Sequence, residues 1–227
     1  MESRGTSATG SQKSWRTVVV SLICGAIVAV AGCGGSDSGQ NLSASNRPAN
    51  VRGVLIQPAV HKPDVTLTDT SGQPFSIAGE TRGYLTVLYL GYTHCPDACP
   101  TTMADLAAAL KSLPPASAAR VKVIFVTTDP ARDTPAVLRK WLDLFDVAFV
   151  GLTGTDEQVQ ALESELRLPP GEKEDDGNGG YSVSHAAYAL AFTANDDIAH
   201  TVYPEGFARA DLTADLTLLA TRGWPNG

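Results

Sequence analysis

The chain has 227 residues, of which 43% are hydrophobic and 18% charged, so it has the length and the composition of one sizeable globular domain. Its 24 acidic residues outnumber 17 basic ones, giving a formal net charge of -7, and the sequence contains no basic stripe, which argues against a nucleic-acid binder. Four cysteines, two of them within the first 33 residues, exclude a small disulfide-stapled domain.

The beginning of the chain has the pattern of an export signal. Three basic residues precede an uncharged, mostly apolar stretch over residues 17–31. An uncleaved membrane helix is the alternative interpretation, but a helix that crosses a bilayer core needs about 20 apolar residues. The pattern therefore favours a signal peptide.

The letters Val-Ala-Gly-Cys at 30–33 resemble the bacterial lipobox, whose cysteine is lipidated and becomes the new N-terminus. We expect residues 1–32 to be a lipoprotein signal peptide and Cys33 to carry the lipid. The segment 33–50, rich in Gly, Ser and Asn, is then a lipid-anchored flexible linker to a folded domain over 51–227. The protein would lie on the extracytoplasmic face of the cell membrane, held by its lipid anchor.

Apolar runs predict a series of strands after the linker. A hairpin comes first, with arms at 65–68 and 74–77 around an Asp-Thr-Ser-Gly turn. Continuous apolar runs at 84–90 and 121–127 predict strands that are buried on both faces. A third such strand is expected at 147–152.

Helices are expected between these strands, because apolar residues recur there at spacings of three and four. The first helix carries the apolar positions of Met103–Leu113 and stops at two prolines. The second is capped by Asp133 or Thr134 and has Pro135 in its first turn, and the third is capped by Thr155.

The last part of the chain begins with an acidic, Gly-rich segment at 169–180, which predicts a surface loop or lid. Strands are then expected at 184–192 and 198–202, followed by a helix over 212–219. The order hairpin, β-α-β-α-β-α-β-β-α predicts an α/β fold: a thioredoxin-like sandwich with a central mixed sheet flanked by helices and preceded by an N-terminal hairpin.

Two cysteines lie in the loop that follows the strand at 84–90 and opens the next helix, where α/β proteins place their chemistry. Both precede proline, which disfavours the α conformation, so Cys95 and Cys99 are expected outside regular helix, with Cys99 at the cap and Pro100 at the first helical position. The positive end of the helix dipole lowers the pKa of a thiol there. The three intervening residues allow both sulfurs to approach one metal ion, and they also allow a disulfide.

The string Gly-Tyr-Thr-His-Cys-Pro-Asp-Ala-Cys-Pro-Thr-Thr at 91–102 closely resembles the signature of the Sco/SenC family of copper-binding, thioredoxin-like assembly factors. Two further strings, at 128–135 and 183–185, resemble the family, and the resemblance extends in order and spacing over most of residues 60–222. This chain has Ser184 where the family often has Asp, and Ala186 where a hydroxyl residue is common.

The resemblance implies a mononuclear copper site with Cys95, Cys99 and His185 as ligands. Two thiolates and one imidazole form a soft donor set that suits Cu(I) and can also hold Cu(II). Zinc would require a fourth ligand. An imidazole ligand usually has a hydrogen-bond partner for its second ring nitrogen. With Ser184 in place of the family's Asp, such a partner for His185 is less expected.

Other polar residues have simpler interpretations. His94 is expected at the surface or in a gating role, His61 in solvent and His200 on an exposed strand position, so His185 is preferred as the ligand. Tyr92 is expected to pack, and the acidic run at 172–176 to be a solvated loop. The charged residues near the second string are predicted to serve turn and cap chemistry or to act near the site: Asp129, Arg132 and Asp133.

By its resemblance, the chain is predicted to be a copper chaperone that delivers copper to the binuclear copper centre of cytochrome c oxidase during assembly. Its partner would be the copper-bearing subunit of that oxidase or another cuproprotein. A chain that delivers a metal is a metallochaperone more than an enzyme. The alternative is a thiol-disulfide oxidoreductase that reduces cysteines of an extracytoplasmic client through Cys95 and Cys99. A thiol peroxidase of the same fold class is a third hypothesis.

Overall fold

The computed structural model of this protein describes residues 50–175, 177 and 179–225. The expected signal peptide, the anchor at Cys33 and nearly all of the linker lie outside the described residues. Among the helices of the described part, none has the length and apolar character needed to cross a membrane.

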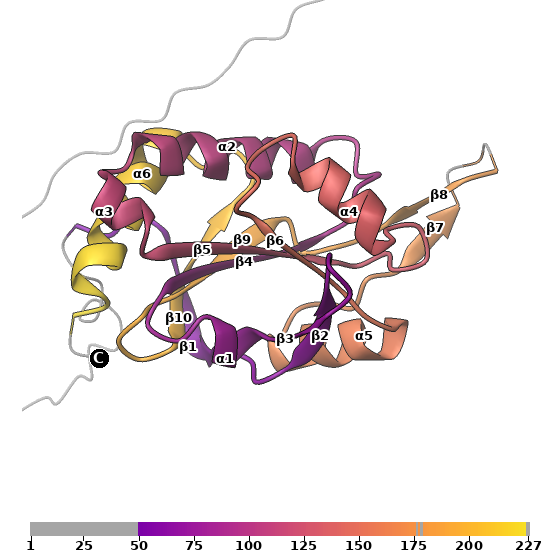
Figure 1. Cartoon of the computed structure of the whole chain (residues 1–227), viewed down its shortest axis with the longest axis horizontal. Helices are drawn as coiled ribbons and strands as arrows, with labels where there is room; N and C mark the ends of the chain where they lie inside the picture. Colours follow the sequence, from indigo (N-terminus) through magenta and orange to yellow (C-terminus); the bar gives the residue numbers. More distant parts are fainter. Residues whose placement is uncertain (1–49, 176, 178, 226–227) are drawn as a thin grey trace, which may run out of the picture. The chain divides into compact units, whose positions relative to one another are not determined.

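One large sheet forms the centre of the folded part (Figure 1). Its eight strands are β1 (Val54–His61), β2 (Thr66–Asp69), β3 (Pro74–Ser76), β4 (Leu85–Gly91), β5 (Val121–Thr127), β6 (Val150–Thr153), β9 (Tyr188–Phe192) and β10 (Ile198–Pro204). Their spatial order is β1-β10-β9-β4-β5-β6-β2-β3. The pairs β4/β5 and β5/β6 are parallel and the others antiparallel, which confirms the predicted mixed sheet.

Helices cover both faces of this sheet (Figure 1). One face carries α2 (Ala98–Ser112), α3 (Pro115–Ala118), α4 (Pro135–Leu142) and α6 (Arg209–Arg222), and the other carries α1 (Ile77–Glu80) and α5 (Asp156–Glu165). Because successive side chains of a strand point to opposite faces, Val87 and Tyr89 join the core under α2, whereas Leu88 and Leu90 join the core under α5. The fully buried strand predicted from the apolar run at 84–90 is thus confirmed, shifted by one residue.

The expected hairpin is present as β2 and β3, which pair in register Leu67 with Phe75 and join the large sheet through β6. The edge strand β1 was not predicted. A register shift between Leu55 and Val60 interrupts its alternation, and Pro58 lies inside it, so its sequence lacks the period of a strand.

Two predicted boundaries are wrong in the second half. The third strand begins at Val150, since Val147 is 77% exposed and precedes the sheet. The strand expected from residue 184 is divided: a short strand β8 (Tyr181–Val183) ends before it, residues 184–187 are irregular, and β9 begins at Tyr188.

The segment 169–180 is not simply a loop. It contains β7 (Lys173–Asp175), which pairs with β8 as a separate two-stranded sheet that projects from the body of the fold (Figure 1). All three residues of β7 are exposed, as predicted for the acidic run, of which Asp176 lies outside the described residues. A polar strand such as β7, with every residue exposed, offers no hydrophobic period from which to predict it.

Candidate metal centre

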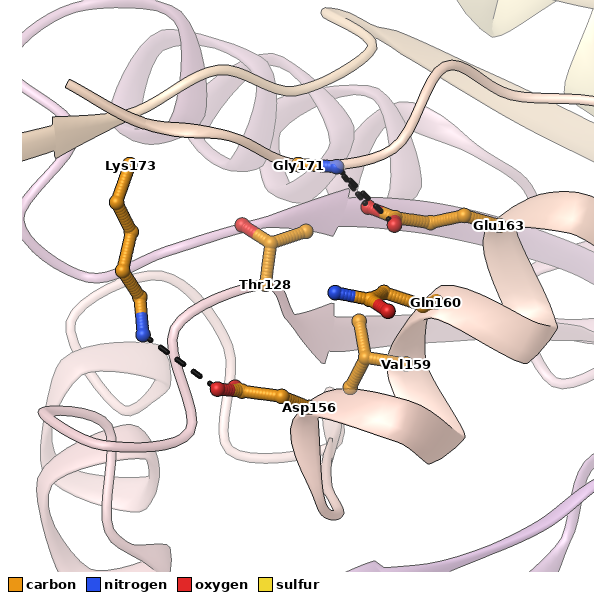
Figure 2. A pocket seen from close by; sticks show the side chains of 7 residues that line it. All are labelled: Thr128, Asp156, Val159, Gln160, Glu163, Gly171 and Lys173. Carbon is orange, nitrogen blue, oxygen red and sulfur yellow. Dashed lines mark hydrogen bonds and ion pairs between the residues drawn. The ribbon is translucent and has the colours of Figure 1, made fainter.

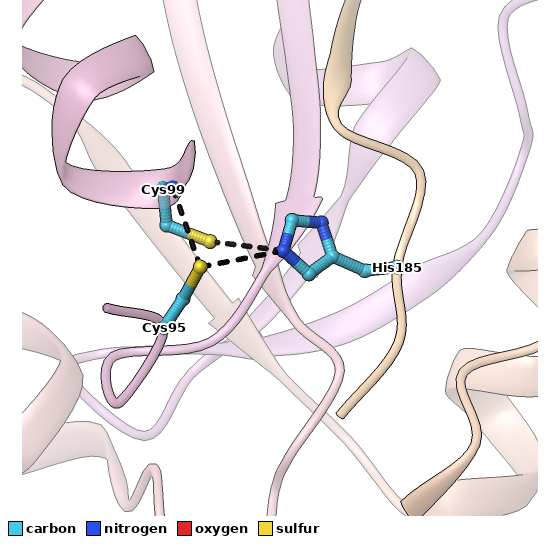
Figure 3. Close-up of side chains that lie close together, drawn as sticks. All are labelled: Cys95, Cys99 and His185. Carbon is cyan, nitrogen blue, oxygen red and sulfur yellow. Dashed lines mark hydrogen bonds between the residues drawn. The ribbon is translucent and has the colours of Figure 1, made fainter. Parts of the chain in front are cut away.

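Three side chains from separate segments converge at the carboxyl end of β4 (Figure 3). Cys95 lies in the loop after β4, Cys99 in the first turn of α2, and His185 in the irregular segment between β8 and β9. The Nε2 atom of His185 lies 3.5 Å from the Cys95 sulfur and 3.4 Å from the Cys99 sulfur. Both cysteines are free, and the three donor atoms lie within 4.8 Å of one another, which is close enough to hold one metal ion.

The position of Cys99 differs from the prediction. Helix α2 begins at Ala98 with Asp97 as its N-cap, so Cys99 is the second helical residue and Pro100 the third. Proline is tolerated there because the first N–H groups of a helix have no partner within it. Cys95 lies outside the helix, as expected, and the Cys99 N–H points at its sulfur from 3.5 Å.

The two thiols have different environments, which separate their pKa values. The Cys99 thiol, together with the N–H groups of Asp97 and Cys99, stabilises the Cys95 thiolate and lowers the pKa of Cys95 to about 4. Burial raises the pKa of Cys99, and the neighbouring Cys95 thiolate acts in the same direction. At neutral pH the metal-free site therefore holds one thiolate and one thiol.

Gly91 provides the space for the second sulfur. A Cβ atom at this position would lie 2.5 Å from the Cys99 sulfur and 2.8 Å from Cε1 of Tyr89. Any larger residue would displace the thiol or the Tyr89 ring, whose hydroxyl donates to Cys99 over 3.9 Å. This role of Gly91 was not predicted, although a glycine that ends a buried strand before a reactive loop signals a close approach.

Aromatic rings hold the imidazole of His185. The rings of Tyr89 and Tyr92 meet it edge-on, with centroids 5.9 and 5.7 Å away. Tyr92 is 3% exposed, which confirms its predicted packing role. The Nδ1 atom of His185 is buried and has no hydrogen-bond partner among the described residues, so Ser184 does not supply one.

Asp133 does not cap the helix that follows it, because Thr134 is the N-cap of α4. Its fully buried carboxylate instead accepts hydrogen bonds from the Thr93 N–H (2.9 Å), the Thr93 hydroxyl (2.5 Å) and the Thr127 hydroxyl (2.6 Å). Asp133 therefore ties the cysteine loop to the end of β5.

Asp129 connects a second pair of segments. This buried carboxylate accepts from the Arg132 guanidinium and, over 2.9 Å, from the Tyr181 hydroxyl. Arg132 also donates to the Tyr181 carbonyl at 2.9 Å and lies over the Tyr181 ring at 3.7 Å. The loop after β5 is thereby fastened to β8, four residues before His185; sequence reasoning missed Tyr181.

The remaining histidines lie outside the cluster. His94 is 54% exposed in its side chain and contacts the Thr93 hydroxyl, and His61 is exposed, as expected. His200 is not the exposed residue that was predicted: it is partly buried, contacts Asp196 over 2.8 Å and stacks on Trp224.

The fold and the site together define a class: a thioredoxin-like protein whose two cysteines and one histidine offer three soft donors to one metal ion. The chain belongs to the SCO1/SenC family, which its sequence matches over residues 55–221. A relative from Stutzerimonas stutzeri, named "Putative copper-binding protein", is 38% identical over 159 residues, which cover 69% of this chain and 71% of that protein.

Solved structures of the family share the fold. The copper-bound structure of ScoI from Bradyrhizobium japonicum has a TM-score of 0.61 and 27% identity, covering 70% of this chain and 99% of that one. BsSco, described as a member of the Sco family of cytochrome c oxidase assembly proteins with a disulfide switch, has a TM-score of 0.57 and 19% identity over 74% of this chain and 98% of its own. At that identity the second likeness shows the fold alone.

Proposed function

We propose that this protein binds one copper ion through Cys95, Cys99 and His185. The observation that carries the proposal is the convergence of two free thiols on one imidazole nitrogen at 3.4 and 3.5 Å. This donor set suits Cu(I) and can also hold Cu(II). Zinc fits less well, because within the described residues no fourth His, Cys, Asp or Glu joins the group.

The copper is cargo in the proposed function, which is delivery to the binuclear copper centre of cytochrome c oxidase during its assembly, or to another cuproprotein. Membership of the SCO1/SenC family and the copper-bound ScoI relative support this. Binding requires both sulfurs as thiolates, so the buried Cys99 must release its proton when the metal enters. Cys95, 9% exposed, is the more accessible sulfur for an incoming client thiolate.

The proposal includes an anchor. Cys33 would carry lipid after removal of residues 1–32, and residues 33–50 would tether the domain over 51–227 to the extracytoplasmic face of the cell membrane. Such a tether would keep the site near a membrane-bound client.

A second candidate function, reduction of a client disulfide, is favoured by the lowered pKa of Cys95. Its thiolate would attack a client sulfur to form a mixed disulfide, and Cys99, after losing its proton, would displace the client thiolate and leave a Cys95–Cys99 disulfide. Both functions use the same two sulfurs, but only metal delivery requires the imidazole of His185.

Copper titration of the reduced full-length chain tests the first function. Cys95→Ser, Cys99→Ser and His185→Ala are each expected to weaken Cu(I) affinity, whereas His94→Ala, which removes the exposed neighbouring imidazole, leaves it unchanged. Unchanged affinity in the cysteine variants would overturn the proposal. If client maturation survives His185→Ala with the dithiol potential unchanged, the reductase function replaces copper delivery.

A further inference from the structure

The backbone that carries His185 depends on its neighbour across the β7–β8 hairpin. The Ser184 N–H donates to the Glu172 carbonyl at 2.9 Å, and the Glu172 N–H donates to the Ser184 hydroxyl at 3.0 Å. Nδ1 of His185 has no partner among the described residues. Apart from the two sulfurs, the position of this ring therefore depends on this backbone and on the two tyrosine rings. Whatever fixes residues 171–172 therefore also fixes His185.

Glu163 of α5 holds residues 171–172 in place. Its side chain is buried, at 3% exposure, and its two carboxylate oxygens lie 3.2 and 3.1 Å from the Gly171 nitrogen (Figure 2). Gly171 fits closely between the two elements, since a Cβ there would lie 3.2 Å from the Ser184 carbonyl and 3.3 Å from Oε1 of Glu163. A continuous series of contacts thus runs from α5 through Gly171 to the residue before His185.

No Lys or Arg among the described residues forms an ion pair with Glu163. Glu163 lines a cavity of about 230 Å³, and Lys173, on the wall of the same cavity, pairs with Asp156 instead, at 3.6 Å (Figure 2). Burial raises the pKa of Glu163, while the Gly171 N–H and the electrostatic interaction with His185 lower it. The buried carboxylate of Glu163, held against Gly171, therefore places a negative charge beside the segment that carries His185.

We propose that Glu163 is a positioning residue for His185, and that its negative charge favours Cu(II) over Cu(I) at the centre. The inference rests on the proposed ligand set. With two thiolates and a neutral imidazole, a Cu(I) centre carries a net charge of -1 and a Cu(II) centre is neutral. A fixed negative charge nearby raises the energy of the anionic centre relative to the neutral one.

Two substitutions separate the hydrogen bond of Glu163 with Gly171 from the charge of Glu163. Glu163→Gln keeps an oxygen that accepts from Gly171 but removes the charge, and Glu163→Ala removes both. Glu165→Gln is the matched control, because it makes the same chemical change on the same helix at an exposed position. The reduced full-length chain is titrated with Cu(I) and with Cu(II) against competing chelators, and the Cu(II) form is examined by electron paramagnetic resonance.

Glu163→Gln is expected to lower Cu(II) affinity about tenfold while Cu(I) affinity stays near that of the unaltered protein. Glu163→Ala is expected to weaken both affinities and to alter the Cu(II) spectrum, and Glu165→Gln to change neither. Equal ratios of Cu(II) to Cu(I) affinity in Glu163→Gln and Glu165→Gln would overturn the inference.

His185→Ala, measured in the same way, separates this failure from that of the copper site itself. If His185→Ala weakens copper binding and Glu163→Gln leaves the ratio unchanged, the ligand set stands and only the role of Glu163 is wrong. If His185→Ala has no effect on either affinity, the ligand set is wrong and the role of Glu163 falls with it.

Discussion

Cys95 and Cys99 have the same chemistry in the sequence but opposite environments in the fold. Cys95 receives N–H groups from the start of α2 and a thiol from Cys99, whereas Cys99 is fully buried beside Tyr89. The helix start therefore stabilises one thiolate, and burial keeps the other sulfur protonated until a metal or a disulfide partner arrives. A site with this asymmetry has one sulfur that reacts first and one that completes the reaction.

Alkylation of the reduced, metal-free chain measures this asymmetry. With the pKa of Cys95 lowered to about 4, its thiolate is fully present above that pH and is lost as the pH falls through it. The rate with iodoacetamide should therefore be nearly constant between pH 6 and 8, and Cys95 should be modified before Cys99, as read by peptide mass spectrometry. A thiol with an ordinary pKa near 8.5 would instead react about tenfold faster for each unit of pH between 6 and 8. The urea-unfolded chain should show that pH dependence. The same pH dependence at Cys95 of the folded chain would contradict the lowered pKa.

The sequence could predict the three candidate ligands but not their immediate surroundings. The spacing and residue types of the cysteine loop sufficed for Cys95 and Cys99, and the resemblance to a family supplied His185. The position of Cys99 within α2 was missed, because the rule for residues before proline describes average backbone preference and not the first turn of a helix. Contacts between residues distant in sequence, such as Thr93 with Asp133, leave no local pattern.

At the scale of elements, the site depends on loops that buried carboxylates hold together. Asp133 joins the cysteine loop to β5, and Asp129 joins the loop after β5 to β8. These carboxylates accept from N–H and O–H donors in segments whose backbone is irregular, alongside the apolar packing of Tyr92 and Cys95.

Asp133→Ala tests this arrangement. Three donors would lose their acceptor: the Thr93 N–H, the Thr93 hydroxyl and the Thr127 hydroxyl. Because buried unsatisfied donors are costly, the free energy of unfolding should fall by roughly 3 kcal/mol in urea denaturation at pH 7. Asp143→Ala, which removes an exposed partner of Arg139, should change it by less than about 0.5 kcal/mol. Equal effects of the two substitutions would show that the Asp133 network does not hold the fold.

Elements with a strong hydrophobic period were predictable, and those without one were not. The buried strands β4 and β5 lie within one residue of their apolar runs, and Thr155 caps α5 with the full capping box. The edge strand β1 is interrupted by a bulge, and β7 is polar on both faces, so neither carries the alternation from which a strand is predicted. These two elements are stabilised by pairing with β10 and β8, which is a tertiary property.

At the scale of the whole molecule, chemistry and stability occupy different regions. Two apolar cores, one on each face of the sheet, stabilise the described part, and the candidate metal centre lies at the carboxyl end of β4. The cysteine loop, the loop after β5 and the segment before β9 meet there, so the site can vary while the sheet is kept.

The proposed anchor is tested by substituting the two N-terminal cysteines separately in a bacterial host. The lipid on Cys33 would contain more than one acyl chain. Stable membrane binding requires this, because a single chain binds a membrane only weakly and reversibly. The mature protein should therefore begin at Cys33, carry the mass of the lipid and incorporate labelled fatty acid, whereas Cys33→Ser should incorporate none. Cys24→Ser is the matched control: it lies in the segment expected to be removed, so its mature product should have the same mass as that of the unaltered chain. A mature protein that retains residues 1–32 and carries no lipid would instead indicate an uncleaved apolar segment and exclude the lipoprotein assignment.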